Sequence, residues 1–214
     1  MAKFVTPLGN INVTIIGHAS VMIDWNGRKI ITDPYGEIAD YTKLPVMDLI
    51  LITHDHYDHL DPVALRPITG DKTIIISTPA VAKILKGVRI LRQGETYEFF
   101  GVHITATYAY NINQRNEKGE LFHPKGVGNG YILDFGGFKL YFAGDTELIP
   151  EMRDLGTIDV AFLPKNLPFT MSDDMFIDAV NVIKPHNVYP YHYFHLDVNA
   201  LKKRLPAEVK MFVK

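Results

Sequence analysis

The stretch that decides the fold is THDHYDHL (Thr53 to Leu60), which places three histidines and two aspartates within six residues. It directly follows LILIT (Leu49 to Thr53), whose apolar run predicts a strand buried on both faces. Functional sites in α/β architectures are built at the carboxyl ends of such strands. An exposed polar loop with chance histidines is the competing interpretation, and the density of ligating and acidic side chains argues against it.

The spacing within this cluster suits metal binding. In extended backbone, residues two apart point the same way, so His54 and His56 can share one ion. A turn at Tyr57 would direct Asp58 and His59 towards a second ion. Two neighbouring divalent ions can hold a bridging hydroxide, because they lower the pKa of water towards neutrality. The cluster therefore predicts a site for two divalent ions that could hold such a hydroxide.

Composition narrows the possible functions. The 214 residues carry 22 Lys and Arg against 24 Asp and Glu, so the net charge of −2 gives no electrostatic signature of nucleic-acid binding. Nucleic acid is thereby disfavoured as a partner without being excluded. With 0 cysteines and 9 histidines, a metal must be held by imidazole, carboxylate or amide groups. The length favours a single domain over residues 1–214.

The pattern of apolar segments also predicts the location of the protein. No stretch approaches the roughly 18 consecutive apolar residues of a membrane span. The opening residues MAKFVTPLGN lack the apolar run of a signal peptide. We therefore expect a cytoplasmic protein that acts on a small-molecule substrate and has no membrane partner. The sequence does not indicate an oligomeric state.

The order of apolar runs and turns predicts two similar halves. Alternating runs over 11–33, with the hairpin signal Asn26-Gly27, predict an antiparallel meander, and strand–helix units follow to residue 91. A second meander over 96–142, interrupted by a long polar loop at 111–129, is again followed by strand–helix units. Helices are expected at 62–66, 79–85, 148–155, 172–183 and 198–204. This order favours an α+β (α/β) fold in four layers, αββα, with two sheets face to face and helices outside.

Four segments of the chain resemble the metallo-β-lactamase superfamily of metal-dependent hydrolases. THDHYDHL is similar to its HxHxDH signature, YFAGDT (141–146) to the motif that carries its bridging Asp, and YPYHYF (189–194) to its final His motif. GHASVMID with ITDP (17–24 and 31–34) is similar to the start of the ascorbate-6-phosphate lactonase-like branch. The resemblance covers nearly the whole chain. It implies the αββα metallo-β-lactamase fold with a metal site at one edge.

The resemblance also implies roles for individual residues. His54 and His56 would bind the first metal, Asp58 and His59 the second; Asp145 would bridge both, and His192 would complete the second. The sequence around Asp145 agrees, because the residue ends an apolar strand behind Gly144. His192 directly follows a strand-like run, which favours it over His195 three residues later.

The third ligand of the first metal departs from the family pattern. TATYAYN (105–111) resembles the strand that usually ends in this His, but Asn111 stands there, and an amide is a poor zinc ligand. His123 in the long polar loop is the favoured substitute. Coordination by Asn111, directly or through water, and an incomplete first site are the alternatives.

Several further residues are candidates for supporting roles. His18, in a turn between two strands, would orient substrate or a ligand by resemblance to the branch named above. Asp33 resembles the acid that orients a ligand imidazole. Ordinary turn functions are the alternative for both. Lys125 and Lys165 are candidates for binding an anionic substrate, although solvated lysines would look the same.

These observations together predict a hydrolase with two divalent ions, zinc by default and manganese or iron as alternatives. Its bridging hydroxide would attack a small ester, lactone or phosphorylated metabolite, and Asp58 would be the catalytic residue that positions this nucleophile. A metal-dependent phosphodiesterase or nuclease is one alternative. A degenerate, non-catalytic metal- or ligand-binding module is another, and its motivation is Asn111 in the ligand position.

Overall fold

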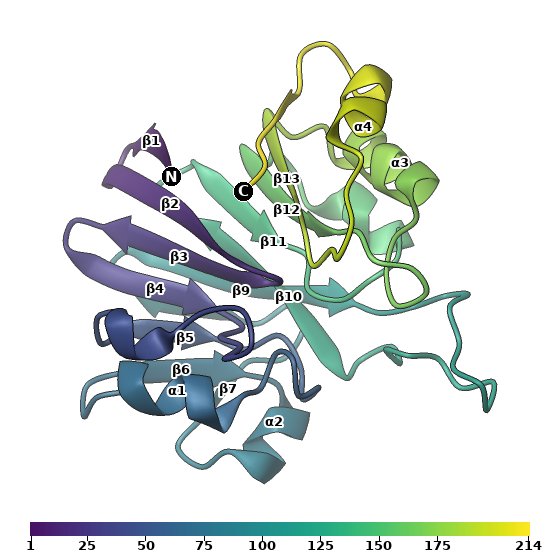
Figure 1. The fold of residues 1–214 in the computed structure, drawn as a ribbon. Coiled ribbons are helices and arrows are strands. Elements are labelled where there is room, and N and C mark those ends of the chain that lie inside the picture. Colours follow the sequence, from purple (N-terminus) through teal and green to yellow (C-terminus); the bar gives the residue numbers. More distant parts are fainter.

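Two seven-stranded sheets pack face to face in the computed structural model, which describes residues 1–214 (Figure 1). The first sheet runs in chain order: β1 (Ala2–Thr6), β2 (Gly9–Gly17), β3 (Ser20–Trp25), β4 (Arg28–Thr32), β5 (Leu49–Leu51), β6 (Ile74–Ser77) and β7 (Arg89–Ile90). The second contains β8 (Thr96–Phe99), β9 (Val102–Ala109), β10 (Gly128–Asp134), β11 (Lys139–Phe142), β12 (Val160–Pro164), β13 (Asn187–Tyr191) and β14 (Lys210–Met211).

The two sheets share one topology. In each, the first four strands pair antiparallel and the remaining pairs, from β4 to β7 and from β11 to β14, are parallel. Short turns connect the antiparallel neighbours except β9 and β10, which a long loop joins, whereas parallel neighbours need crossover connections, which here carry the helices. The two halves predicted from the sequence are therefore present.

Helices cover the outer face of each sheet. Those on the first sheet are η1 (Tyr41–Lys43), α1 (Pro62–Ile68) and α2 (Pro79–Ile84); those on the second are η2 (Pro150–Asp154), α3 (Asp173–Ile183) and α4 (Val198–Arg204). Local signals start them: Asp61 caps α1 by accepting from the amides of Val63 and Ala64, and Ser172 caps α3. None of these helices has both the length and the apolar character needed to span a bilayer.

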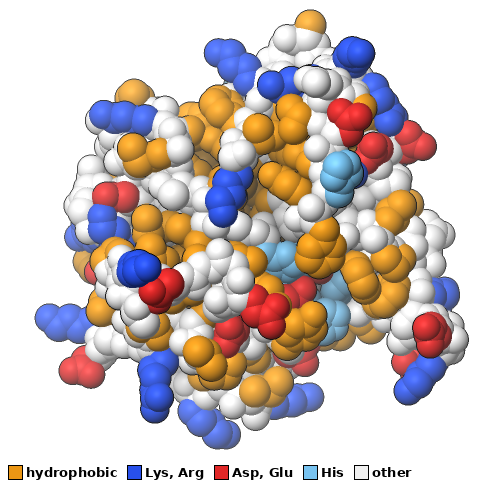
Figure 2. Space-filling model, viewed as in Figure 1, with side chains coloured by type: hydrophobic (Ala, Val, Ile, Leu, Met, Phe, Trp, Pro, Cys, Tyr) orange, Lys and Arg blue, Asp and Glu red, His pale blue; other side chains and the backbone are white.

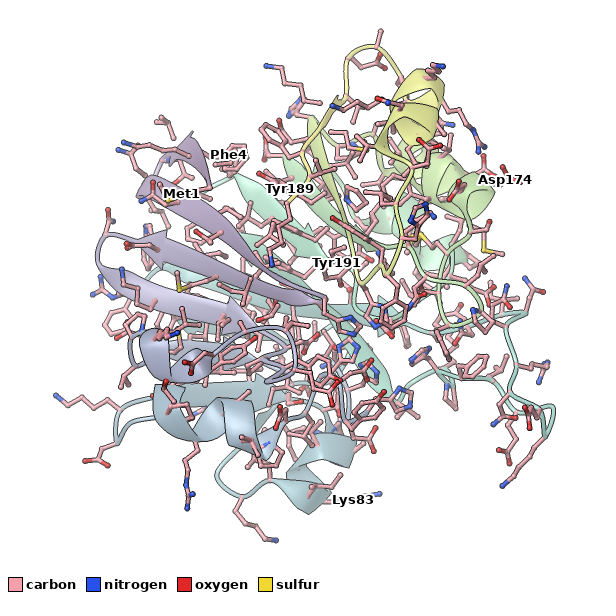
Figure 3. The ribbon with its side chains drawn as sticks, viewed as in Figure 1. Met1, Phe4, Lys83, Asp174, Tyr189 and Tyr191 are labelled. Atoms are coloured by element: carbon pink, nitrogen blue, oxygen red, sulfur yellow. The ribbon has the colours of Figure 1, made fainter.

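Three apolar clusters fill the spaces between the four layers. On β5, Leu49 and Leu51 face the cluster between the sheets, while Ile50 faces the cluster under α1 and α2. Side chains alternate across a strand, so a strand buried on both faces must be apolar at every position. Tyr189 of β13 belongs to the central cluster and Phe4 of β1 packs against it; both are labelled in Figure 3. The predicted αββα fold is confirmed.

Two local predictions were wrong or incomplete. Strand β1 was not predicted; its register, from Ala2 opposite Val13 to Thr6 opposite Gly9, extends the first meander by one strand. The helix expected at 148–155 is a single 3₁₀ segment, η2. Pro150 supplies no amide proton and Ile149 gives no side-chain cap, so the segment is held by the amide of Met152 donating to the Ile149 carbonyl.

Candidate metal centre

Strand ends from both sheets bring the predicted ligands to one place. His54 and His56 follow β5, Asp145 follows β11, and His192 follows β13. Figure 2 shows pale-blue histidine side chains gathered in one hollow of the surface. The cavity there measures about 500 Å³, and its lining includes His56, Asp145 and His192. Residues far apart in the sequence thus form one site.

A first group consists of His54, His56 and His123. One ring nitrogen from each lies within 4.8 Å of the others. The Nε2 atoms of His54 and His123 are buried and have no hydrogen-bond partner. An unpartnered buried nitrogen is costly, and a metal ion would satisfy it. The structure therefore places His123, rather than Asn111, beside the two histidines of the signature.

A second group consists of Asp58, His59 and His192, with His18 beside them. The Nε2 atoms of His59 and His192 are 3.1 Å apart, and Asp58 Oδ2 is 3.7 Å from the latter. Two imidazole nitrogens converging with a carboxylate match the donor set of a divalent metal. His195, the rival of His192, is exposed and belongs to neither group.

Asp145 lies between the two groups. Its Oδ2 is 3.3 Å from His123 Nε2 and 3.1 Å from His192 Nε2, and its Oδ1 is buried without a hydrogen bond. The residue before it, Gly144, has φ +67°, and a Cβ there would lie 2.6 Å from the Asn129 carbonyl oxygen. Glycine is required for the turn that presents Asp145 to both groups.

Asp33 and Thr53 orient the imidazole rings of His54 and His59 through contacts at Nδ1. Asp33 Oδ2 is 2.9 Å from His59 Nδ1, and the amide and hydroxyl of Thr53 both donate to Asp33. The Thr53 hydroxyl also lies 3.0 Å from His54 Nδ1. With Nδ1 engaged in this way, the Nε2 atoms of both histidines face the site, as metal ligands require.

Asn111 fixes His123 through hydrogen bonds to its backbone amide and its ring. Its Oδ1 accepts from the His123 amide at 2.8 Å and lies 2.7 Å from His123 Nδ1. Its Nδ2 donates to the Phe169 carbonyl and to Glu147 Oε1. The amide is thus fully occupied in orienting the imidazole whose Nε2 faces the first group.

Sequence reasoning missed two residues of this site. Glu147 is buried and accepts from the amides of Asn113 and Gln114, which fixes the start of the long loop. Asn166 approaches His192 Nδ1 with its side-chain amide at 3.4 Å. The only sequence signal for Glu147 was its position two residues after Asp145 at a strand end.

His18 contacts the second group directly. Its Nε2 is 3.0 Å from Asp58 Oδ2, its ring centroid is 3.9 Å from that of His192, and its carbonyl accepts from the His192 amide. His18, Asp33 and His192 all have positive φ, at 49°, 36° and 56°. Such backbone strain in non-glycine residues concentrates at functional sites.

Charges within the site determine its protonation. Burial opposes ionisation of Asp145, but His192 and His59 outweigh it and hold the pKa of this carboxyl well below its usual range. Burial likewise opposes protonation of His192, yet Asp145 raises the pKa of His192 to about 9. Burial lowers the pKa of His54 well below its ordinary value, so this imidazole is neutral near pH 7. Neutral imidazole is the form that binds metals.

The two lysines proposed as anion ligands are both paired with carboxylates. Lys125 Nζ lies 2.6 Å from Glu151 Oε1, and Lys165 Nζ lies 2.7 Å from Asp173 Oδ1. Neither lines the cavity. The structure therefore does not bring them to the site.

Comparison with known proteins defines the class. A family model described as the beta-lactamase superfamily domain matches residues 12–192, a range that contains every predicted ligand. A UPF0173 metal-dependent hydrolase of Methanosarcina mazei is 30% identical over 205 residues, covering 89% of this chain and 86% of that protein. The chain belongs to the UPF0173 metal-dependent hydrolase family within the metallo-β-lactamase superfamily. The narrower resemblance to an ascorbate-6-phosphate lactonase-like branch stays a prediction.

Two solved structures are similar over nearly the full length. A protein of Parabacteroides distasonis, provisionally assigned as a metal-dependent hydrolase, has a TM-score of 0.94 and 39% identity, covering 100% of this chain and 97% of that one. Igni18, described as a novel metallo hydrolase from Ignicoccus hospitalis, has a TM-score of 0.76 and 27% identity, covering 95% and 94%.

Proposed function

We propose that this chain is a hydrolase that holds two divalent metal ions, with zinc as the first candidate, and cleaves a small ester or lactone, phosphorylated metabolites being among the candidate substrates. The observation that carries the proposal is the pair of ligand groups joined by Asp145, together with the unpartnered buried Nε2 atoms of His54 and His123. Manganese and iron suit the same imidazole and carboxylate donors.

Each residue has a distinct part in this proposal. The first ion would be held by His54, His56 and His123, the second by Asp58, His59 and His192, and Asp145 would serve both. Bound divalent ions supply Lewis acidity and make water nucleophilic near neutral pH. Asp58 faces the cavity, and its carboxylate would orient the attacking water and accept its proton. His18, at 3.0 Å from Asp58, would fix that carboxylate.

The reaction is hydrolysis at an acyl carbon. The water oxygen joins the acyl carbon while the bond from that carbon to the alcohol oxygen breaks. One proton of the water leaves with the alcohol, and the other is released from the carboxylic acid product. The alternative of a non-catalytic module depended on an unfilled first site, and the position of His123 supports the enzyme instead.

Purified protein loaded with zinc would test this function on a panel of carboxylic esters, lactones, thioesters and phosphodiesters. We expect turnover of at least one ester or lactone, and loss of that turnover both in metal-stripped protein and in His54→Ala. Rates that are equally low in wild type and His54→Ala across the panel would contradict the proposal.

A further inference from the structure

The cavity over the two ligand groups has an aromatic rim. Four of its lining residues are hydrophobic, and all four are aromatic: Tyr57, Phe122, Phe169 and Phe194. Phe122 and Phe169 meet edge to face with ring centroids 4.9 Å apart, whereas Tyr57 and Phe194 are 75% and 81% exposed. Large rings exposed around a hollow are typical of a surface that a ligand covers.

No lysine or arginine lines this cavity. Its carboxylates are those of Asp55, Asp58 and Asp145. Lys214 lines a neighbouring hollow beside His18, where its ammonium group donates to the Ile16 carbonyl. In Figure 2 the pale-blue histidines are bordered by orange and red atoms. With both ions bound, Asp58 and Asp145 would be engaged as ligands, so an anionic group at the rim, away from the ions, would face the carboxylate of Asp55 and find no lysine or arginine to pair with.

We propose that the substrate is an uncharged carboxylic ester or lactone with an apolar acyl group, and that Phe122, Phe169 and Phe194 hold that group. The inference rests on the proposed hydrolase function and narrows it, because it removes the phosphorylated metabolites from the predicted substrates. A cavity of about 500 Å³ accommodates a small acyl group. Water adds to the acyl carbon, the alcohol leaves with one proton, and an acid with an apolar side group is released.

The position of Phe169 links this rim to the ligand groups. Its carbonyl accepts from Asn111 Nδ2 at 2.9 Å, and the Oδ1 of the same asparagine holds His123. Its amide donates to the carbonyl of Asn166, the residue whose side chain approaches His192. The backbone that carries this ring is thus hydrogen-bonded to Asn111 and Asn166, which also contact one proposed ligand of each metal. Such coupling would hold the acyl carbon of the substrate in a fixed position relative to the metal ligands.

A matched series of activated esters tests the inference on zinc-loaded protein. The esters are 4-nitrophenyl acetate, butyrate and monosuccinate, with 4-nitrophenyl phosphate as the anionic comparison. We expect kcat/KM for the butyrate to exceed that for the succinate by about tenfold or more, because only the succinate brings a charge to the aromatic rim. Phe169→Ala and Phe194→Ala should each raise KM for the butyrate several-fold, and by more than KM for the acetate, because the acetyl methyl group offers the rings less to contact.

Phe100→Ala is the control variant, since Phe100 is also an exposed phenylalanine but lies between β8 and β9, outside the cavity lining. A second readout is saturation-transfer NMR of 2-hexanone against 5-oxohexanoate, two ketones of equal carbon number. We expect transfer to the neutral ketone, reduced in the two rim variants and retained in Phe100→Ala. Because Phe194 is highly exposed, its variant is not expected to disturb folding.

The outcomes separate the two proposals. Hydrolysis of the succinate or the phosphate at least as fast as the butyrate would overturn the apolar-acyl inference and leave the hydrolase function standing. Unchanged butyrate kinetics in both rim variants would overturn it as well. Absence of zinc-dependent turnover of every ester, in this series and in the broader panel, would instead refute the hydrolase function on which the inference rests.

Discussion

At the residue scale, Asn111 and His123 divide between them the task that one histidine performs in the family pattern. Asn111 lies two residues after the end of β9, where the ligand was expected, and turns its oxygen to His123 instead of to the site. His123 comes from the loop and supplies the nitrogen that faces His54 and His56.

Replacing these two residues should have different effects on metal content. We expect His123→Ala to retain about one of two zinc ions, because the first group loses a third of its donors. Asn111→Ala should keep both ions at saturating zinc but weaken the first by about 10- to 100-fold, the usual cost of losing a partner that orients a ligand. Elemental analysis and zinc titration measure the two quantities. Two tightly bound ions in His123→Ala would contradict the assignment.

The pairing of His192 with Asp145 predicts how stability changes with pH in metal-stripped protein. Burial opposes protonation, but Asp145 raises the pKa of His192 from 6.5 to about 9. The imidazolium thus stabilises the fold fully below about pH 6.5, and this contribution is lost as the pH rises through about 9. We expect the free energy of unfolding to fall by on the order of 3 kcal/mol over this interval.

Urea denaturation at several pH values measures this decline, and His192→Gln is the comparison. The variant should show a smaller decline rather than none, because Asp145 and Asp33 overcome the effect of burial and raise the pKa of His59 as well. The same decline in both proteins would show that His192 does not carry it.

The structure gathers every ligand residue favoured from the sequence, whereas of the supporting residues the sequence named His18 and Asp33 but neither Glu147 nor Asn166. The close spacing of His54 and His56 predicted that they meet, and they do so in the structure, where the chain bends at residues 55 and 56. Glu147 and Asn166 act through contacts with residues 34 and 26 positions away, and no local pattern encodes such contacts. Their roles became visible only once both sheets were assembled.

At the scale of elements, the long loop between β9 and β10 is held by one buried carboxylate. Glu147 accepts from two loop amides and from the side chains of Asn111 and Asn113, and its own amide donates to the Tyr110 carbonyl. A polar loop has few apolar contacts to order it, so this carboxylate takes over that role. The predicted range of 111–129 was close because the loop composition differs sharply from that of the strands.

Glu147→Gln should loosen this loop while preserving side-chain size. We expect a loss of about 1–3 kcal/mol in stability, since an amide cannot accept from several donors with both of its polar atoms. Amides of Asn113 and Gln114 should exchange hydrogen faster, and zinc should bind more weakly at the group that contains His123. Hydrogen-exchange mass spectrometry and zinc titration measure these effects.

Glu151→Gln is the matched control for this loop. Glu151 pairs with Lys125 near the surface, where an ion pair contributes only about 0–1 kcal/mol. Glu151→Gln should leave both the amide hydrogen exchange of Asn113 and the zinc affinity unchanged. If both variants behave alike, the buried carboxylate has no special part in ordering the loop.

At the scale of the whole molecule, the site joins the two halves of the fold. His54, His56, Asp58 and His59 come from the half containing the first sheet, and His123, Asp145 and His192 come from the other. A backbone bond from the His192 amide to the His18 carbonyl also links the halves beside the site. The symmetric order of strands was predictable from hydrophobic period, whereas their pairing and face-to-face packing depend on long-range contacts.

A metal centre built from both halves should stabilise the whole fold. A metal ion that binds only the folded state stabilises that state by about 4 kcal/mol when the free zinc concentration is 1,000 times the Kd. For a chain of this size each kcal/mol shifts Tm by about 2–4 °C, so chelation should lower Tm by on the order of 10 °C. Differential scanning calorimetry with and without chelator measures the shift.

His56→Ala and His103→Ala provide the decisive comparison for this effect. Both histidines are exposed, but His56 belongs to the first ligand group and His103 lies on β9 outside either group. Without metal, the two variants should unfold close to wild type, because neither side chain is buried. When zinc is added, the Tm of His103→Ala should rise as much as that of wild type, and the Tm of His56→Ala should rise distinctly less. An equal gain in all three proteins would mean that zinc stabilises the fold from somewhere other than the groups joined by Asp145.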